Sequence, residues 1–136
     1  MPTNEPTEIV RRSQELLRSE PGNRLALIYG SFASGKMRPD SDVDIAVLFD
    51  HPLDAKQKMD LAERLGKSLS KTVDLTDLFS LNGTILRQIL CTGHVLVKND
   101  PAALLALTKR MIYNQADVMP LVRRTLQERQ MRFGYG

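Results

Sequence analysis

The stretch of sequence that decides the fold is residues 27–49, which read LIYGSFASGKMRPDSDVDIAVLF. It begins inside the apolar run from Leu25 to Tyr29, which is typical of a buried strand. It ends in residues 43–49, where apolar side chains recur at every second position, as they do in a strand. Residues 30–39 contain two glycines and two basic residues, so we expect a loop there. The stretch therefore predicts two strands joined by a glycine-containing loop.

Acidic residues gather where the second of these strands begins. Asp42 and Asp44 are two residues apart, so on a strand their carboxylates share one face. Two like charges repel each other and lose hydration there, so either a cation compensates them or one of them holds a proton. Mg²⁺ fits this role, because it takes hard oxygen ligands and usually binds through one or two carboxylates plus substrate phosphates.

A third carboxylate is predicted on the next strand. Asp74 lies between Val73 and Leu75, so it faces away from these two apolar neighbours. If this strand lies beside the one that carries Asp42 and Asp44, the three carboxylates meet on one patch. Three carboxylates are enough to hold a site with two metal ions.

The loop between the first two strands offers a place for phosphate groups. Gly30 follows a buried strand and permits a tight turn or a close approach of the backbone. We expect Ser31 to open a short helical turn whose free N–H groups, with the serine hydroxyl, bind phosphate oxygens. Gly35, Lys36 and Arg38 supply flexibility and positive charge nearby. Together with the carboxylates, this loop indicates metal-assisted phosphoryl or nucleotidyl transfer.

The rest of the chain alternates between helical and strand patterns, which predicts an α/β domain with a small mixed sheet, flanking helices and a long C-terminal helical segment. The expected helices are 8–19 with Thr7 as cap, a second one that Asp54 caps, 84–90, and 101–131 with a kink at Pro120. The inner face of the second helix is expected to consist of Met59, Leu61, Ala62, Leu65 and Leu69. The expected further strands are 72–78 and 95–97.

Length and charge place further bounds on the chain. Its 136 residues fit one domain. Residues 1–99 are balanced in charge, whereas residues 100–136 hold six basic and three acidic residues and so carry the whole net charge of +3. We expect residues 1–99 to form the catalytic part and residues 100–136 to form a helical segment of the same domain that docks a partner. No basic run exceeds two residues and aromatic residues are 5% of the chain, so direct nucleic-acid binding is not expected.

The sequence also bears on the compartment. No apolar run is long enough to span a bilayer, and the first residues do not resemble a signal peptide. The single cysteine, Cys91, excludes an internal disulfide and fits the reducing cytoplasm. We expect Cys91 to be a small buried side chain. The protein is thus predicted to be cytoplasmic and to have no membrane partner.

At this point the sequence resembles a known family. Gly30-Ser31, ten intervening residues and Asp42-Val43-Asp44 resemble the signature of the polymerase-beta-type nucleotidyltransferase superfamily. The small size, the Thr72-Val-Asp-Leu-Thr-Asp-Leu segment and the helical tail are similar to its minimal branch, the MntA-like antitoxins of type VII-like HEPN/MNT toxin-antitoxin systems. The resemblance implies a nucleotidyltransferase fold and a partner that is a HEPN-domain toxin, an RNase of the HepT type. It also implies Mg²⁺-dependent transfer of AMP from ATP to a tyrosine hydroxyl of that toxin, which silences it.

The resemblance also assigns roles to residues. Gly30 and Ser31 would contact the nucleotide's phosphates, while Asp42, Asp44 and Asp74 would bind two Mg²⁺ ions. Asp74 would also help to deprotonate the acceptor hydroxyl. The chain departs from the pattern at Ser34, where relatives often carry arginine, and there Lys36 or Arg38 would have to supply the charge.

Two other functions stay open at this stage. One is an antitoxin that neutralises its toxin by binding alone, through the C-terminal helices. The other is nucleotidyl transfer to a small molecule, although relatives with that activity usually carry a further helical domain. A DNA-binding regulator is less favoured because no recognition helix is apparent.

Overall fold

The computed structural model describes residues 5–36, 38 and 40–113. Its centre is a four-stranded sheet in the order β3-β2-β1-β4. Strand β1 is antiparallel to β2 and to β4, whereas β2 and β3 are parallel, so the sheet is mixed as predicted. The strands are β1 (Asn23–Tyr29), β2 (Val43–Phe49), β3 (Val73–Asp77) and β4 (His94–Lys98).

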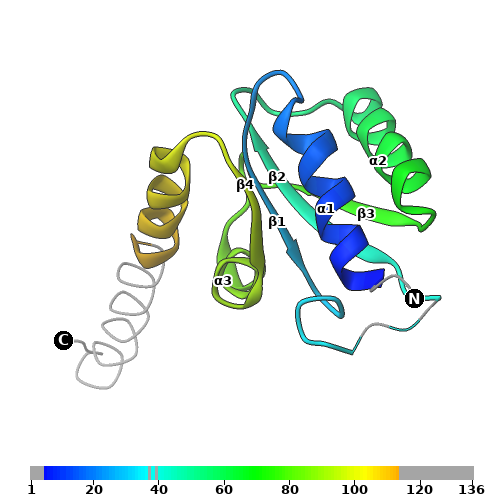
Figure 1. The fold of residues 1–136 in the computed structure, drawn as a ribbon. Coiled ribbons are helices and arrows are strands. Elements are labelled where there is room, and N and C mark those ends of the chain that lie inside the picture. Colours follow the sequence, from blue (N-terminus) through cyan, green and yellow to red (C-terminus); the bar gives the residue numbers. More distant parts are fainter. Residues whose placement is uncertain (1–4, 37, 39, 114–136) are drawn as a thin grey trace, which may run out of the picture.

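Helices cover both faces of this sheet. Helices α1 (Glu5–Arg18) and α2 (Ala55–Leu69) lie side by side on one face, while α3 (Gly83–Thr92) and the helix of residues 101–113 lie on the other (Figure 1). The two central strands, β1 and β2, are accordingly apolar on both sides. The α/β architecture with flanking helices is therefore the one that the sequence predicts.

Strand periodicity divides the core into two parts. Alternate residues of the central strands, among them Ile28 and Ile45, pack under α1 and α2. The residues between them, among them Leu27 and Ala46, pack with α3 and the helix of residues 101–113. Because successive side chains of a strand point to opposite faces, this division fixes the face to which every polar strand residue belongs.

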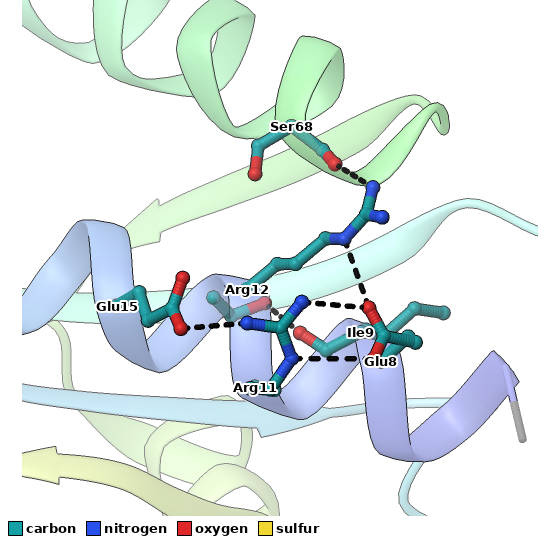
Figure 2. A network of polar contacts seen from close by, with 7 residues as sticks. Glu8, Ile9, Arg11, Arg12, Glu15 and Ser68 are labelled. Carbon is teal, nitrogen blue, oxygen red and sulfur yellow. Dashed lines mark hydrogen bonds and ion pairs between the residues drawn. The ribbon is translucent and has the colours of Figure 1, made fainter. Parts of the chain in front are cut away.

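The two helices of the first face are tied together by polar contacts near their ends. Figure 2 shows Arg12 of α1 donating from Nη1 to the Ser68 carbonyl of α2 at 3.0 Å and from Nε to Glu8 at 3.1 Å. Lys71, just after α2, contacts the Glu5 carboxylate at 2.9 Å. At its other end α2 begins with a capping box, in which Asp54 and Gln57 satisfy each other's backbone N–H groups. The predicted cap at Asp54 is thus confirmed.

Three local expectations are wrong. Thr7 lies inside α1, which begins at Glu5, so it is not the cap. Met59 is 69% exposed, because the inner face of α2 is formed by Leu61, Leu65 and Leu69 and position 59 falls outside that stripe. Cys91 is exposed, because the buried residues of α3 are Leu86 and Ile89 and Cys91 points elsewhere.

The C-terminal segment is described only in part. A helix follows Pro101, as predicted, and continues to residue 113. The expected kink at Pro120 and the helix beyond it lie outside the described residues. In the part of the chain that the structure describes, no helix is long and apolar enough to cross a membrane.

Candidate active site

The polar residues of the three adjacent strands form a row across the sheet. In the strand register Tyr29 of β1 pairs with Asp44 of β2, and Asp44 pairs with Asp74 of β3. Paired residues of neighbouring strands point to the same face. This is the face that α3 covers, and the row lies at the end of β1 where the loop of residues 30–42 begins (Figure 1). The structure therefore brings together two of the predicted carboxylates, with Asp42 immediately before β2.

Of the three carboxylates, that of Asp44 is the most buried. Its side chain is half-buried, whereas Asp42 and Asp74 are exposed. Burial raises the pKa of Asp44, and the negative charges of Asp74 and Asp42 and a hydrogen bond with Asp74 raise this pKa further. Without a cation, burial and these neighbouring negative charges thus disfavour the charged form of Asp44.

These carboxylates suit a hard divalent cation that also binds substrate. Among residues 5–36, 38 and 40–113, no three His, Cys, Asp or Glu side chains are arranged as a complete metal site. The expected site of three converged carboxylates is therefore not preformed. The Asp44–Asp74 pair nevertheless supplies closely spaced oxygen donors that repel each other, with Asp42 near enough for its charge to act on Asp44. Mg²⁺ typically binds through such a pair and completes its shell with phosphate oxygens and water.

Gly30 connects the loop to these carboxylates. Its φ of +73° lies in the left-handed region, which disfavours side chains. A Cβ atom built on Gly30 would also overlap Oδ2 of Asp44 and lie 3.0 Å from its Cγ. The absence of a side chain at Gly30 thus lets the backbone of the loop lie directly against the Asp44 carboxylate.

The loop after Gly30 contains the predicted short helical turn, which ends in a Schellman-type cap with Gly35 in the left-handed conformation. Its N–H groups from Ser34 onward donate within the loop: Ser34 to the Gly30 carbonyl at 3.1 Å, Gly35 to Phe32 at 3.2 Å and Lys36 to Ser31 at 2.9 Å. The amides of Ser31, Phe32 and Ala33 donate no hydrogen bond to any other residue that the structure describes. Three successive amides at the start of this turn therefore remain for an anion.

The other predicted residues of the loop are exposed. Gly35 has a φ of +75°, and nothing lies within 4 Å of a Cβ atom built on it. Lys36 and Arg38 are on the surface, and the Arg38 backbone is held by Ser41, whose hydroxyl accepts from the Arg38 N–H at 2.9 Å. The Ser34 hydroxyl donates to the Ser31 carbonyl at 3.1 Å. Ser34 thus stabilises the turn but brings no charge.

Tyr29 is a residue of the carboxylate face to which the sequence analysis assigns no role. Its hydroxyl crosses β2 and shares a hydrogen bond of 2.8 Å with Thr76 Oγ1 of β3. Burial raises the pKa of Tyr29, while the Thr76 hydrogen bond lowers it and the charges of Asp44 and Asp74 raise it. The alternation of β1 identifies Tyr29 as a residue of the carboxylate face once β1 is known to lie beside β2.

Asp77, which the sequence analysis does not include among the site residues, has a structural role. Its carboxylate accepts from the Leu53 N–H at 2.9 Å and from the Phe79 N–H at 3.0 Å. It therefore joins the end of β3 to the loop before α2 and is separate from the site.

Comparisons with known proteins agree with this arrangement. A family model described as polymerase beta, nucleotidyltransferase matches residues 12–102. The chain is 36% identical over 80 residues to the protein adenylyltransferase MntA of Shewanella oneidensis. That match covers 58% of the chain and spans 58% of the length of this relative.

Two solved structures are similar along most of the chain. One is a toxin-antitoxin crystal structure with AMP-PNP, at a TM-score of 0.65 and 27% identity, covering 88% of this chain and 96% of that one. The other is a tri-AMPylated Shewanella oneidensis HEPN toxin in complex with an MNT antitoxin, at a TM-score of 0.64 and 26% identity, covering 86% and 95%. Both share the fold over regions that extend beyond the family match.

Proposed function

Because the chain belongs to the polymerase beta nucleotidyltransferase family, we propose that it is an antitoxin that transfers AMP from ATP to a tyrosine hydroxyl of a HEPN-domain toxin. The observation that carries this proposal is the in-register pair of Asp44 and Asp74 beside the Gly30 loop. The naming of one relative as a protein adenylyltransferase and the tri-AMPylated toxin bound to another support the choice of donor and acceptor.

The proposal gives each predicted residue a task. Asp42, Asp44 and Asp74 hold Mg²⁺, which when bound neutralises the triphosphate and the departing pyrophosphate. The free amides after Gly30, with the Ser31 hydroxyl, hold phosphate oxygens, and Lys36 and Arg38 add positive charge from the rim. Asp74, the exposed member of the carboxylate pair, is the residue that accepts the proton of the acceptor.

The reaction is a substitution at the α-phosphorus of ATP. The tyrosine O–H bond breaks and its proton moves to the Asp74 carboxylate. A bond forms between the tyrosine oxygen and the α-phosphorus, and the bond from that phosphorus to the oxygen bridging to the β-phosphate breaks. AMP remains on the tyrosine and pyrophosphate leaves.

The acceptor is a separate protein, so the chain needs a docking surface for it. We assign docking to residues 100–136, the segment that holds the excess positive charge. The described part of this segment exposes apolar side chains about two turns apart on its helix, Leu105 at 56% and Ile112 at 54%. Consumption of ATP and the lone cysteine favour a cytoplasmic location.

Incubation with the HEPN-domain protein encoded in the adjacent reading frame tests the proposal. With ATP and Mg²⁺, intact-mass spectrometry should show the toxin heavier by one or more AMP groups, and fragmentation should locate them on tyrosine. The Asp42→Ala/Asp44→Ala variant should leave the toxin unmodified. Asp50→Ala is a matched control, since Asp50 is an exposed aspartate at the far end of β2.

The same experiment separates catalysis from binding. If the Asp42→Ala/Asp44→Ala variant still neutralises the toxin as fully as the unaltered protein, binding alone accounts for the antitoxin effect. If the unaltered protein adds no AMP to the toxin, the proposed activity is wrong.

A further inference from the structure

We propose that the acceptor segment of the partner binds as an added β-strand along the open edge of β3, which brings its tyrosine onto the carboxylate face. This inference rests on the proposed function, because it states how the partner reaches Asp74. Among the strands that the structure describes, β3 is the last in the sheet order and pairs with β2 alone. In Figure 1 it lies at the margin of the sheet beside α2.

The register shows which backbone groups of β3 remain for a partner. The Thr72 carbonyl accepts a hydrogen bond from the Val43 N–H at 2.9 Å, and the Leu78 N–H donates to the Val47 carbonyl at 2.8 Å. In a parallel pair every second residue directs both its backbone groups to the same neighbour, so the even-numbered residues of β3 face β2. The N–H and C=O groups of Val73 and Leu75 therefore face away from the sheet. Such unpaired groups are a template for strand addition.

A groove between α2 and β3 follows this edge, and its lining includes residue 74. Two adjoining hollows between α2 and β3 share Met59, Ala62 and Val73 as lining residues, and the second also includes Asp74. Met59 is 69% exposed and offers an apolar wall. A chain that lies in the groove would thus run past residue 74, whose carboxylate stands on the opposite face of the sheet.

The charge of the groove defines the side chains that it suits. Its lining includes Lys58, Lys67 and Lys71 but only Glu63 and Asp74 as acids. Lys71 is engaged with Glu5 at 2.9 Å. The remaining two lysines and two acids balance, so the segment that fits is extended, with apolar side chains toward α2 and a tyrosine on the opposite face.

Tyr29 shows that a tyrosine on this sheet has the necessary reach. From β1 its hydroxyl crosses one whole strand to meet Thr76 of β3 at 2.8 Å. Alternate side chains of a strand added beyond β3 would stand on the same face. A tyrosine on the added strand that extends across β3, as Tyr29 extends across β2, would reach Asp44 by passing over Asp74. The proposed transfer takes place at these two carboxylates.

Hydrogen–deuterium exchange on the complex with the adjacent-frame HEPN protein, without ATP, tests this placement. The amides of Val73 and Leu75 should exchange more slowly in the complex than in the free protein. Protection confined to the helix of residues 101–113, with none at these two amides, would overturn the inference. Slow exchange at both amides in the free protein together with a dimeric mass would also overturn it, because a second copy would then occupy the edge.

A substitution at the edge adds a functional test. Val73→Pro removes the outward N–H and leaves the β2–β3 hydrogen bonds intact, and proline is tolerated on edge strands in this way. AMP transfer to the toxin should fall about tenfold or more, with ATP binding unchanged, whereas Val73→Ala, which keeps the N–H, should stay near the unaltered rate. Equal transfer by both variants would overturn the inference while leaving the activity established. Absence of transfer by the unaltered protein would instead refute the proposed function, and the exchange experiment would still decide the docking surface.

Discussion

Two glycines of one loop have the same backbone conformation but different surroundings. Gly30 and Gly35 have φ values of +73° and +75°, yet only Gly30 has Asp44 where a side chain would be. A non-glycine residue in this conformation costs roughly 1–2 kcal/mol by itself. The difference between the two positions therefore isolates the contact with the carboxylate from the effect of backbone strain.

Alanine substitution at both glycines exploits this difference. Gly30→Ala should lower AMP transfer on the order of 100-fold, because it displaces Asp44 from its place beside the loop. Gly35→Ala should cost similar backbone strain but keep most of the activity. Initial rates and melting temperatures of both variants are the measurement, and equal losses of activity would refute the special role of Gly30.

The repulsion between Asp44 and Asp74 predicts opposite effects on stability and activity. Asp44→Asn removes one of two adjacent charges, so the melting temperature without divalent cations should rise or stay unchanged, while AMP transfer should be lost. The unaltered protein should gain stability as Mg²⁺ is added, by about 2.7 kcal/mol at a hundredfold excess over the dissociation constant. Asp44→Asn should show little of this gain in a thermal-shift titration. An equal Mg²⁺ response in both proteins would place the metal elsewhere.

At the scale of elements, a single residue orients the C-terminal helix on the sheet. The Asp100 carboxylate accepts from Arg24 of β1 at 2.8 Å and 3.0 Å and from the Ala102 N–H at 3.0 Å. The hydrogen bond with Arg24 is the main reason that the pKa of Asp100 is lowered from its usual value of 3.8. The start of the helix of residues 101–113 is thus tied to β1.

A pH series of melting temperatures checks this contact. Because the folded-state pKa of Asp100 is lowered, its stabilising effect is complete above the unfolded value of 3.8 and disappears as the pH falls through the lowered folded value. The Asp100→Asn side chain can still accept from the Ala102 N–H at the start of the helix, but it no longer forms an ion pair with Arg24. It should melt at a slightly lower temperature at pH 7, and the difference should vanish in acid. A difference that persists at low pH would show that the Arg24 ion pair is not its cause.

Local sequence patterns predicted the helices and strands, but they did not predict which side chains of each helix are buried. The alternation in residues 43–49 and the cap at Asp54 are local features, and both strand and helix are found where they were expected. Met59 and Cys91 were misplaced because an apolar side chain at a plausible spacing does not by itself reveal which stripe the tertiary structure buries. The short helical turn after Gly30 is found where it was expected, because Ser34 donates to the Gly30 carbonyl and Gly35 ends the turn with a positive φ.

At the scale of the whole molecule, the site depends on strand pairing over a long sequence separation. The spacing of Asp42 and Asp44 places both on one face, but their distance from Asp74 depends on whether β3 lies beside β2. That neighbour relation is not encoded in either segment alone, so it remained a condition in the sequence analysis. The role of Tyr29 was missed for the same reason, since its contact with Thr76 spans three strands.

The order of the strands also explains how a small domain can act on a large acceptor. The carboxylate row starts on a central strand and ends at β3, the edge of the sheet, so the site opens sideways rather than into a closed cavity. A partner can therefore complete the site without a second domain in this chain. Docking by residues 100–136 and strand addition at β3 are compatible, because they involve different parts of the molecule.

The fate of the α-phosphorus of ATP tests the central claim most directly. We would incubate the protein, Mg²⁺ and the HEPN toxin with ATP labelled either at the α- or at the γ-phosphorus. Label from the α position should appear on a toxin tyrosine, and label from the γ position should leave in pyrophosphate. Transfer of the γ label, or unlabelled toxin that is nonetheless neutralised, would contradict nucleotidyl transfer by Asp42, Asp44 and Asp74.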